Sequence, residues 1–133
     1  MDEHRIILAR YRLEKALNCI EVSKLNLDND FLSDSVNRSY YAIFYAARAI
    51  MALDGIDRKK HSGVISYFQE SYIKTGIFTK ELSNIIQDAF NIRQITDYQD
   101  FFVMGYDDAV EQLKCAEKFC SEIKIYIEKF IGM

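Results

Sequence analysis

The sequence of 133 residues contains no proline. Proline interrupts helices more strongly than any other residue, so its absence permits long uninterrupted helices. The five glycines fall almost entirely at breaks between stretches of helical hydrophobic periodicity. No stretch shows a convincing strand-like alternation of apolar and polar residues. The chain is therefore predicted to fold as an all-α protein.

Apolar residues that recur at three- and four-residue spacing predict five helices. Their expected ranges are about 3–25, 33–54, 62–74, 79–93 and 107–131. Apolar residues and alanines cover most of the circumference of the second helix, so we expect it to contact neighbours on several sides. The spacing in the fifth helix is typical of an antiparallel bundle. We expect a single domain over residues 1–133, an antiparallel up-and-down four-helix bundle with an additional short helix.

Short polar segments separate the expected helices. Residues 28–30 are predicted to form a turn, and Ser33 or Asp34 is expected to cap the start of the second helix. Gly76 is expected to end the third helix in a left-handed conformation. Residues 97–106 are predicted to be irregular.

The charge balance argues against one class of function. The chain carries 17 Lys and Arg against 20 Asp and Glu, a net charge of −3. Non-specific coating of DNA depends mainly on neutralisation of phosphates by cationic side chains, so this chain is a poor candidate for it. A local basic site remains compatible with the charge.

Targeting, membrane and metal-binding patterns are not recognised in the sequence. The N-terminal residues lack the basic start and apolar run of a signal peptide. The most apolar stretch, residues 40–53, is too short to cross a bilayer and contains an arginine. The three cysteines lack the spacing of zinc ligands and are interpreted as reduced thiols. We expect a cytoplasmic protein that binds no membrane, no metal and no cofactor.

Two arginines and two tyrosines line one side of the second expected helix. Arg38, Tyr41, Tyr45 and Arg48 follow one another at steps of three, four and three residues. Guanidinium groups bind phosphate, and phenol rings stack on bases, so this stripe is a candidate site for a nucleotide or RNA. In the alternative interpretation the tyrosines belong to the core, and the arginines pair with carboxylates of a neighbouring helix or of a second subunit.

A short basic run, residues 58–61, precedes the third expected helix and includes Lys60 and His61. Free backbone N–H groups at the start of that helix would add to its attraction for an anion. The alternative is a solvated loop. His61 is a candidate acid, base or capping residue, although a lone histidine beside a serine more often has a structural role.

The end of the fourth expected helix carries Arg93, Asp97 and Tyr98. If the helix continues, Arg93 and Asp97 are one turn apart and can form a salt bridge. Alternatively, the three side chains offer a cation, a carboxylate and a phenol to a ligand.

Four segments in this order, residues 37–49, 60–65, 72–76 and 93–98, resemble the HEPN family. The likeness is to its small stand-alone prokaryotic branch, often encoded beside a minimal nucleotidyltransferase. It implies a four-helix bundle that forms a homodimer. The resemblance also implies an activity found in many members of the family, that of a metal-independent ribonuclease that acts as a toxin, with the nucleotidyltransferase as antitoxin.

The family's catalytic signature is an arginine followed four to six residues later by a histidine, brought together from two subunits. Arg93 matches the arginine, but Tyr98 stands in the histidine's place. An unperturbed tyrosine has a pKa about three units above neutrality, so forming its phenolate costs roughly 4 kcal/mol. Tyr98 is therefore a poor replacement for the histidine as a base.

These observations lead to three hypotheses. The first is a nucleotide- or RNA-binding component of a toxin–antitoxin-like pair, without the intact ribonuclease signature, in which a partner nucleotidyltransferase could modify Tyr98. The second is a divergent ribonuclease in which His61 is the acid or base and Arg93 stabilises the phosphorane. The third is a purely structural dimerisation protein. Contact between the tips of Arg93 and His61 would favour the ribonuclease.

Overall fold

The structure is a computed structural model that describes residues 2–99 and 103–132. Every element in these ranges is helical, which confirms the all-α prediction. The elements are α1 (Glu3–Asp28), α2 (Leu32–Leu53), α3 (His61–Phe68), the π-helical segment η1 (Gln69–Ile73), α4 (Lys80–Tyr98) and α5 (Tyr106–Phe130). The four long helices form the predicted bundle, and α3 with η1 is the additional short helix.

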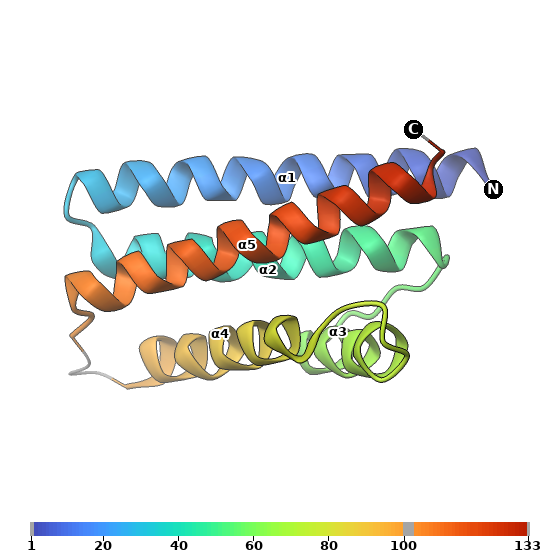
Figure 1. Cartoon of the computed structure of the whole chain (residues 1–133). Helices are drawn as coiled ribbons and strands as arrows, with labels where there is room; N and C mark the ends of the chain where they lie inside the picture. The colour runs from blue at the N-terminus through green and yellow to red at the C-terminus, as the bar shows by residue number, and fades with distance from the viewer. Residues whose placement is uncertain (1, 100–102, 133) are drawn as a thin grey trace.

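The helix α2 lies at the centre of the bundle (Figure 1). It packs against α1, α5, α4 and α3. In Figure 1, α1 and α4 lie on opposite sides of α2, while α5 crosses in front of it. The expectation that α2 touches several neighbours is therefore confirmed, and its remaining surface is bounded by α1 on one side and α4 on the other.

The composition of α2 explains this central position. Ala42, Ala46 and Ala49 are completely buried, and their small side chains let neighbouring helices approach closely. Ile43 of α2 and Phe119 of α5 are also completely buried. Burying a side chain of this size contributes about 1.5–3 kcal/mol relative to leaving it exposed. The same helix that carries the candidate site is thus held by the core.

The start of α2 differs from the prediction. The expected cap at Ser33 or Asp34 is wrong, because α2 begins at Leu32 and Phe31 occupies the N-cap position without a side-chain bond. The reason is a tight turn in which the Phe31 N–H donates to the Asn26 carbonyl at 2.8 Å, so the chain re-enters a helix early. The turn predicted at residues 28–30 is also shorter than expected, because α1 continues through Asp28.

Two later boundaries also differ. The third helix changes to π-helical geometry after Phe68, and Gly76 then adopts the expected left-handed conformation at φ +78°. The fourth helix does not end near Arg93 but continues to Tyr98, so residues 97 and 98 are not irregular. Residues 100–102 of the expected irregular segment lie outside the described residues. Within the part that the structure describes, no helix is long and apolar enough to cross a membrane.

Candidate functional site

Arg93 and His61 meet beside α2. Arg93 projects from α4, and His61 is the first residue of α3. The Nη1 atom of Arg93 lies 3.0 Å from Nδ1 of His61. Two side chains separated by 32 residues of sequence therefore form one polar site within a single chain. This is the contact that the ribonuclease hypothesis requires.

Two tyrosines of α2 complete the site. The Tyr40 hydroxyl lies 2.5 Å from Nδ1 of His61, and Nη2 of Arg93 donates to the Tyr41 hydroxyl at 3.3 Å. The Arg93 guanidinium carbon also lies 5.1 Å from the centre of the Tyr40 ring and 5.5 Å from that of Tyr41. These distances allow cation–π attraction as well as hydrogen bonding. Arg93, His61, Tyr40, Tyr41 and Asp97 are called the Arg93 cluster below.

The contacts of His61 indicate which nitrogen carries the proton. A guanidinium group can only donate, so the Arg93 contact requires a lone pair on Nδ1 and places the proton on Nε2. Burial lowers the pKa of His61, and the charges of Arg93 and Arg48 lower it further. The ring also stacks on Phe44 at a centroid distance of 4.1 Å. Both the Arg93 contact and the lowered pKa therefore favour the neutral imidazole of His61.

Asp97 pairs with Arg93, which is one of the two interpretations that the sequence left open. Its Oδ2 lies 3.1 Å from Nε of Arg93, one helical turn away. Nε itself is buried and makes no hydrogen bond, because the carboxylate is close but not aligned with the N–H. The Arg93 side chain is 23% exposed. The cation is therefore only partly satisfied by its own carboxylate.

Tyr40 is unsuited to proton abstraction. Burial raises the pKa of Tyr40 to about 12, although the charge of Arg93 opposes this rise. The phenol stays protonated at neutral pH and acts as a hydrogen-bonding group. The sequence interpretation missed Tyr40 because it is buried within α2, between positions assigned to the stripe.

Tyr98 does not join the Arg93 cluster. It is 79% exposed and lies beside Asn91, Gln94 and Ile95 at a shallow hollow of α4. Lys60 is also exposed and occupies the N-cap position of α3. The residue in the place of the family histidine therefore points to solvent, while His61 supplies the imidazole from elsewhere in the chain.

The predicted stripe on α2 is partly exposed along its length. The Arg38 guanidinium lies 4.9 Å from the Tyr41 ring centre, and Nζ of Lys15 lies 4.8 Å from that of Tyr45. Arg48 is paired, with Nη2 located 2.9 Å from Oδ1 of Asp57. The carboxylate belongs to the loop after α2, rather than to a neighbouring helix as the alternative interpretation supposed.

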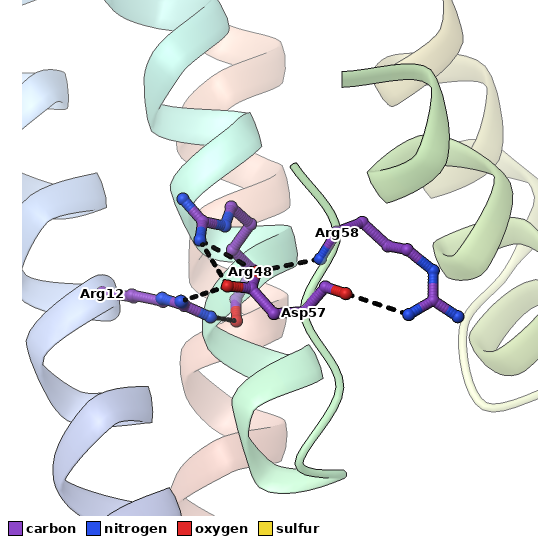
Figure 2. Close-up of polar contacts among 4 residues, drawn as sticks. All are labelled: Arg12, Arg48, Asp57 and Arg58. Atoms are coloured by element: carbon purple, nitrogen blue, oxygen red, sulfur yellow. Dashed lines mark hydrogen bonds and ion pairs between the residues drawn. The ribbon is translucent and has the colours of Figure 1, made fainter. Parts of the chain in front are cut away.

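Asp57 also contacts an arginine that the sequence analysis did not select. Nη2 of Arg12 lies 3.3 Å from Oδ2 of Asp57, so two guanidinium groups share this carboxylate (Figure 2). Arg12 is buried between α1 and α2. Its position was detectable, because Ala9 and Ala16, three residues before and four after it, belong to the apolar face of α1.

The chain was compared with known proteins. The HEPN domain family matches residues 9–126. A UPF0332 protein of Thermotoga maritima is 34% identical over 128 residues, which cover 96% of each chain. The protein named "Putative toxin MJ0142" of Methanocaldococcus jannaschii is 33% identical over 115 residues, 86% of this chain and 78% of its own. A UPF0332 protein of Archaeoglobus fulgidus is 29% identical over 118 residues, which cover 89% of this chain and 94% of the relative.

The lowered pKa of His61 predicts a pH-dependent stability. Above the ordinary histidine pKa near 6.5 both the folded and unfolded states hold His61 neutral. As the pH falls below that value, the unfolded state binds a proton before the folded state does, so the free energy of unfolding decreases. Urea unfolding at pH 7.5 and 5.0 should show a larger acid-induced loss for the wild type than for His61→Asn. A His4→Asn control should behave as wild type, and an equal loss in all three would contradict the assignment.

Proposed function

Because the chain belongs to the HEPN family, we propose that it is a toxin-like protein that binds phosphate groups of a nucleotide or RNA at the Arg93 cluster. The observation that carries this proposal is the incomplete pairing of Arg93. Nε of Arg93 is buried beside Asp97 without an aligned hydrogen bond, but the side chain as a whole is 23% exposed, so a ligand reaches the guanidinium group through its exposed part. A phosphate oxygen is the acceptor that such a planar fork binds best.

The other residues of the cluster support phosphate binding. His61 in its neutral form presents Nε2–H as a donor, and no described residue accepts a hydrogen bond from it. Tyr41 contributes a hydroxyl group and an aromatic face beside Arg93. The site therefore offers a cation, neutral donors and a stacking surface, which is the combination used to bind single-stranded nucleic acids.

The same geometry disfavours proton transfer in the free protein. Metal-free cleavage of RNA needs a base for the 2′-hydroxyl, but Arg93 and Tyr40 both occupy the Nδ1 side of His61. Protonation of His61 to an imidazolium, the form needed for a general acid, is opposed by Arg93 and Arg48. Binding without cleavage is accordingly the proposed activity.

Ribonuclease activity is the second candidate function, and the 3.0 Å contact between Arg93 and His61 favours it. If the scissile phosphate drew Arg93 away from His61 and the Tyr40 hydroxyl also left Nδ1, the freed lone pair could accept the 2′-hydroxyl proton. Arg93 would then stabilise the charge of the phosphorane. This mechanism requires a rearrangement that binding alone does not.

Partners of the protein follow from the proposed family role. We propose that the chain pairs with itself as a homodimer and with a minimal nucleotidyltransferase as an antitoxin-like partner. Two relatives carry the name of a toxin, "Putative toxin MJ0142" and "Putative toxin MJ0605". Ile7, Leu8 and Tyr11 on α1 are exposed apolar side chains that a second copy could cover.

One experiment distinguishes binding from cleavage. Purified wild-type protein is mixed with fluorescently labelled single-stranded RNA in EDTA, and fluorescence anisotropy and gel electrophoresis follow binding and cleavage. Arg93→Gln should weaken binding about tenfold or more, since loss of a charged hydrogen bond costs about 1.5–3 kcal/mol, and Arg93→Lys should have a smaller effect. Lys124→Gln on the exposed side of α5 is the charge-matched control.

The same experiment shows which of the two candidate functions, RNA binding or RNA cleavage, is wrong. We expect intact RNA with the wild-type protein. Cleavage by the wild type that is lost in both Arg93→Gln and His61→Gln would establish the ribonuclease instead. Equal affinities for wild type, Arg93→Gln and Lys124→Gln would show that the Arg93 cluster does not bind RNA.

Tyr98 is proposed as an acceptor of a nucleotidyl group because its side chain is 79% exposed. Its phenol oxygen would attack the α-phosphorus of ATP on the partner enzyme, with release of pyrophosphate and loss of the phenol proton. Mass spectrometry after incubation with that enzyme and ATP should locate an added nucleotide on Tyr98. The modification should be absent from Tyr98→Phe, and an added nucleotide on Tyr106 instead would refute the assignment.

The homodimer is tested by light scattering. The wild-type protein should have twice the chain mass of 15.6 kDa. Tyr11→Glu places a charge in the exposed apolar surface of α1 and should shift the protein toward the monomer. A monomeric wild type across micromolar concentrations would contradict the proposal.

A further inference from the structure

A second group of cationic side chains lies farther along α2. Nη2 of Arg48 lies 2.9 and 3.1 Å from the two carboxylate oxygens of Asp57, and Nη2 of Arg12 lies 3.3 Å from one of them. Figure 2 shows Arg12 and Arg48 converging on Asp57 from α1 and α2. Arg12, Arg48 and Asp57 are called the Asp57 site below.

The charges in the Asp57 site do not balance. Two guanidinium groups face one carboxylate, which leaves one positive charge uncompensated. Burial lowers the pKa of Arg12, and the charge of Arg48 lowers it further, so the two cations destabilise each other. Nε of Arg48 is buried and makes no hydrogen bond. The net charge of these three residues is therefore positive, which favours an additional anion.

Asp57 is the most exposed member of the site, although its Oδ1 also accepts a hydrogen bond from the Arg58 backbone N–H at 2.9 Å. Its side chain is 54% exposed, whereas that of Arg12 is only 10% exposed. Asp57 belongs to the loop between α2 and α3, while both arginines project from long helices. A carboxylate on a loop can leave without disturbing the packing of the helices that fix Arg12 and Arg48.

A cavity of about 170 Å³ adjoins the carboxylate, and Arg12, Asp57, Arg5 and Gly55 contribute to its lining. A water molecule takes about 30 Å³ in the liquid, so the space is sufficient for a phosphate group. Gly55 makes room for another cation there, because a Cβ atom at this position would lie 2.6 Å from Cζ of Arg5. The cavity is thus lined by two arginines, Arg5 and Arg12, and Arg48 reaches it only through its ion pair with Asp57.

We propose that Arg12 and Arg48 form a second phosphate site, and that Asp57 occupies it in the free protein until a ligand phosphate displaces the carboxylate. A phosphate dianion neutralises both guanidinium groups, whereas one carboxylate neutralises one. This inference rests on the proposed function, since it assigns a second phosphate to the ligand that binds at Arg93.

The spacing of the two sites favours a nucleic acid strand. Tyr41 of the Arg93 cluster and Arg48 are seven residues apart on α2, about 10 Å along the helix axis. Phe44 lies between them, with its ring stacked on His61 at 4.1 Å and 5.8 Å from the Arg48 guanidinium carbon. Single-stranded RNA carries regularly spaced phosphates, so one strand can occupy both sites, whereas the one phosphate of AMP cannot.

The test observes each site separately by NMR. The Nε–Hε signals of Arg12, Arg48 and Arg93 are followed while the wild-type protein is titrated with inorganic phosphate, AMP or a six-nucleotide single-stranded RNA. Asp57→Asn removes the competing carboxylate and should tighten phosphate binding at Arg12 and Arg48 at least threefold. Glu128→Gln, on the exposed side of α5, also removes one negative charge but far from this site in the sequence, and it should leave the phosphate affinity of Arg12 and Arg48 unchanged.

The outcomes separate this inference from the proposed function. RNA should shift the signals of all three arginines together and at lower concentration than phosphate or AMP. Signals of Arg12 and Arg48 that stay fixed while Arg93 shifts, or equal affinities in Asp57→Asn and Glu128→Gln, would overturn the second site alone. A fixed Arg93 signal would overturn the proposed function. The double variant Asp57→Asn/Arg48→Gln should lose the tighter phosphate binding of Asp57→Asn, and this loss would support the second site.

Discussion

The contact between the Arg93 guanidinium and the His61 imidazole organises the Arg93 cluster. It joins α4 to α3 against the tyrosines of α2 and fixes the lone pair of Nδ1 toward Arg93. It also keeps a cation at a site that its own carboxylate satisfies only in part. In this state the lone pair of Nδ1 is engaged and is not free to accept a proton.

The helix α2 connects this cluster to the rest of the molecule. One side of it is packed in the core, where alanines allow close contact with neighbouring helices. The side between α1 and α4 carries the aromatic and cationic residues that form the Arg93 cluster and the Asp57 site. Both sites therefore lie on a rigid element, and the carboxylate of Asp57 on the following loop is the group best able to move.

The fold was predictable because its signals are local. Helical periodicity, the lack of proline and the alanine-rich second helix were enough for the all-α bundle. The spacing of Arg93 and Asp97 allowed their ion pair, but it forms only because α4 continues to Tyr98 beyond the expected end of the helix. The start of α2 was not predictable from capping preferences, because a turn hydrogen bond to Asn26 decides it. His61 and Arg93 were selected separately, but their contact depends on how α3 and α4 pack on α2. The pairing of Arg12 with Asp57 was missed for the same reason, since the partner lies 45 residues away.

The protonation state of His61 tests this account most directly. A two-bond proton–nitrogen NMR correlation at pH 7 distinguishes the two neutral tautomers and the imidazolium ion. The account predicts a neutral ring with its proton on Nε2 and a lone pair on Nδ1. A proton on Nδ1, in either the other tautomer or the imidazolium ion, would show that His61 does not accept a hydrogen bond from Arg93 and would contradict the account.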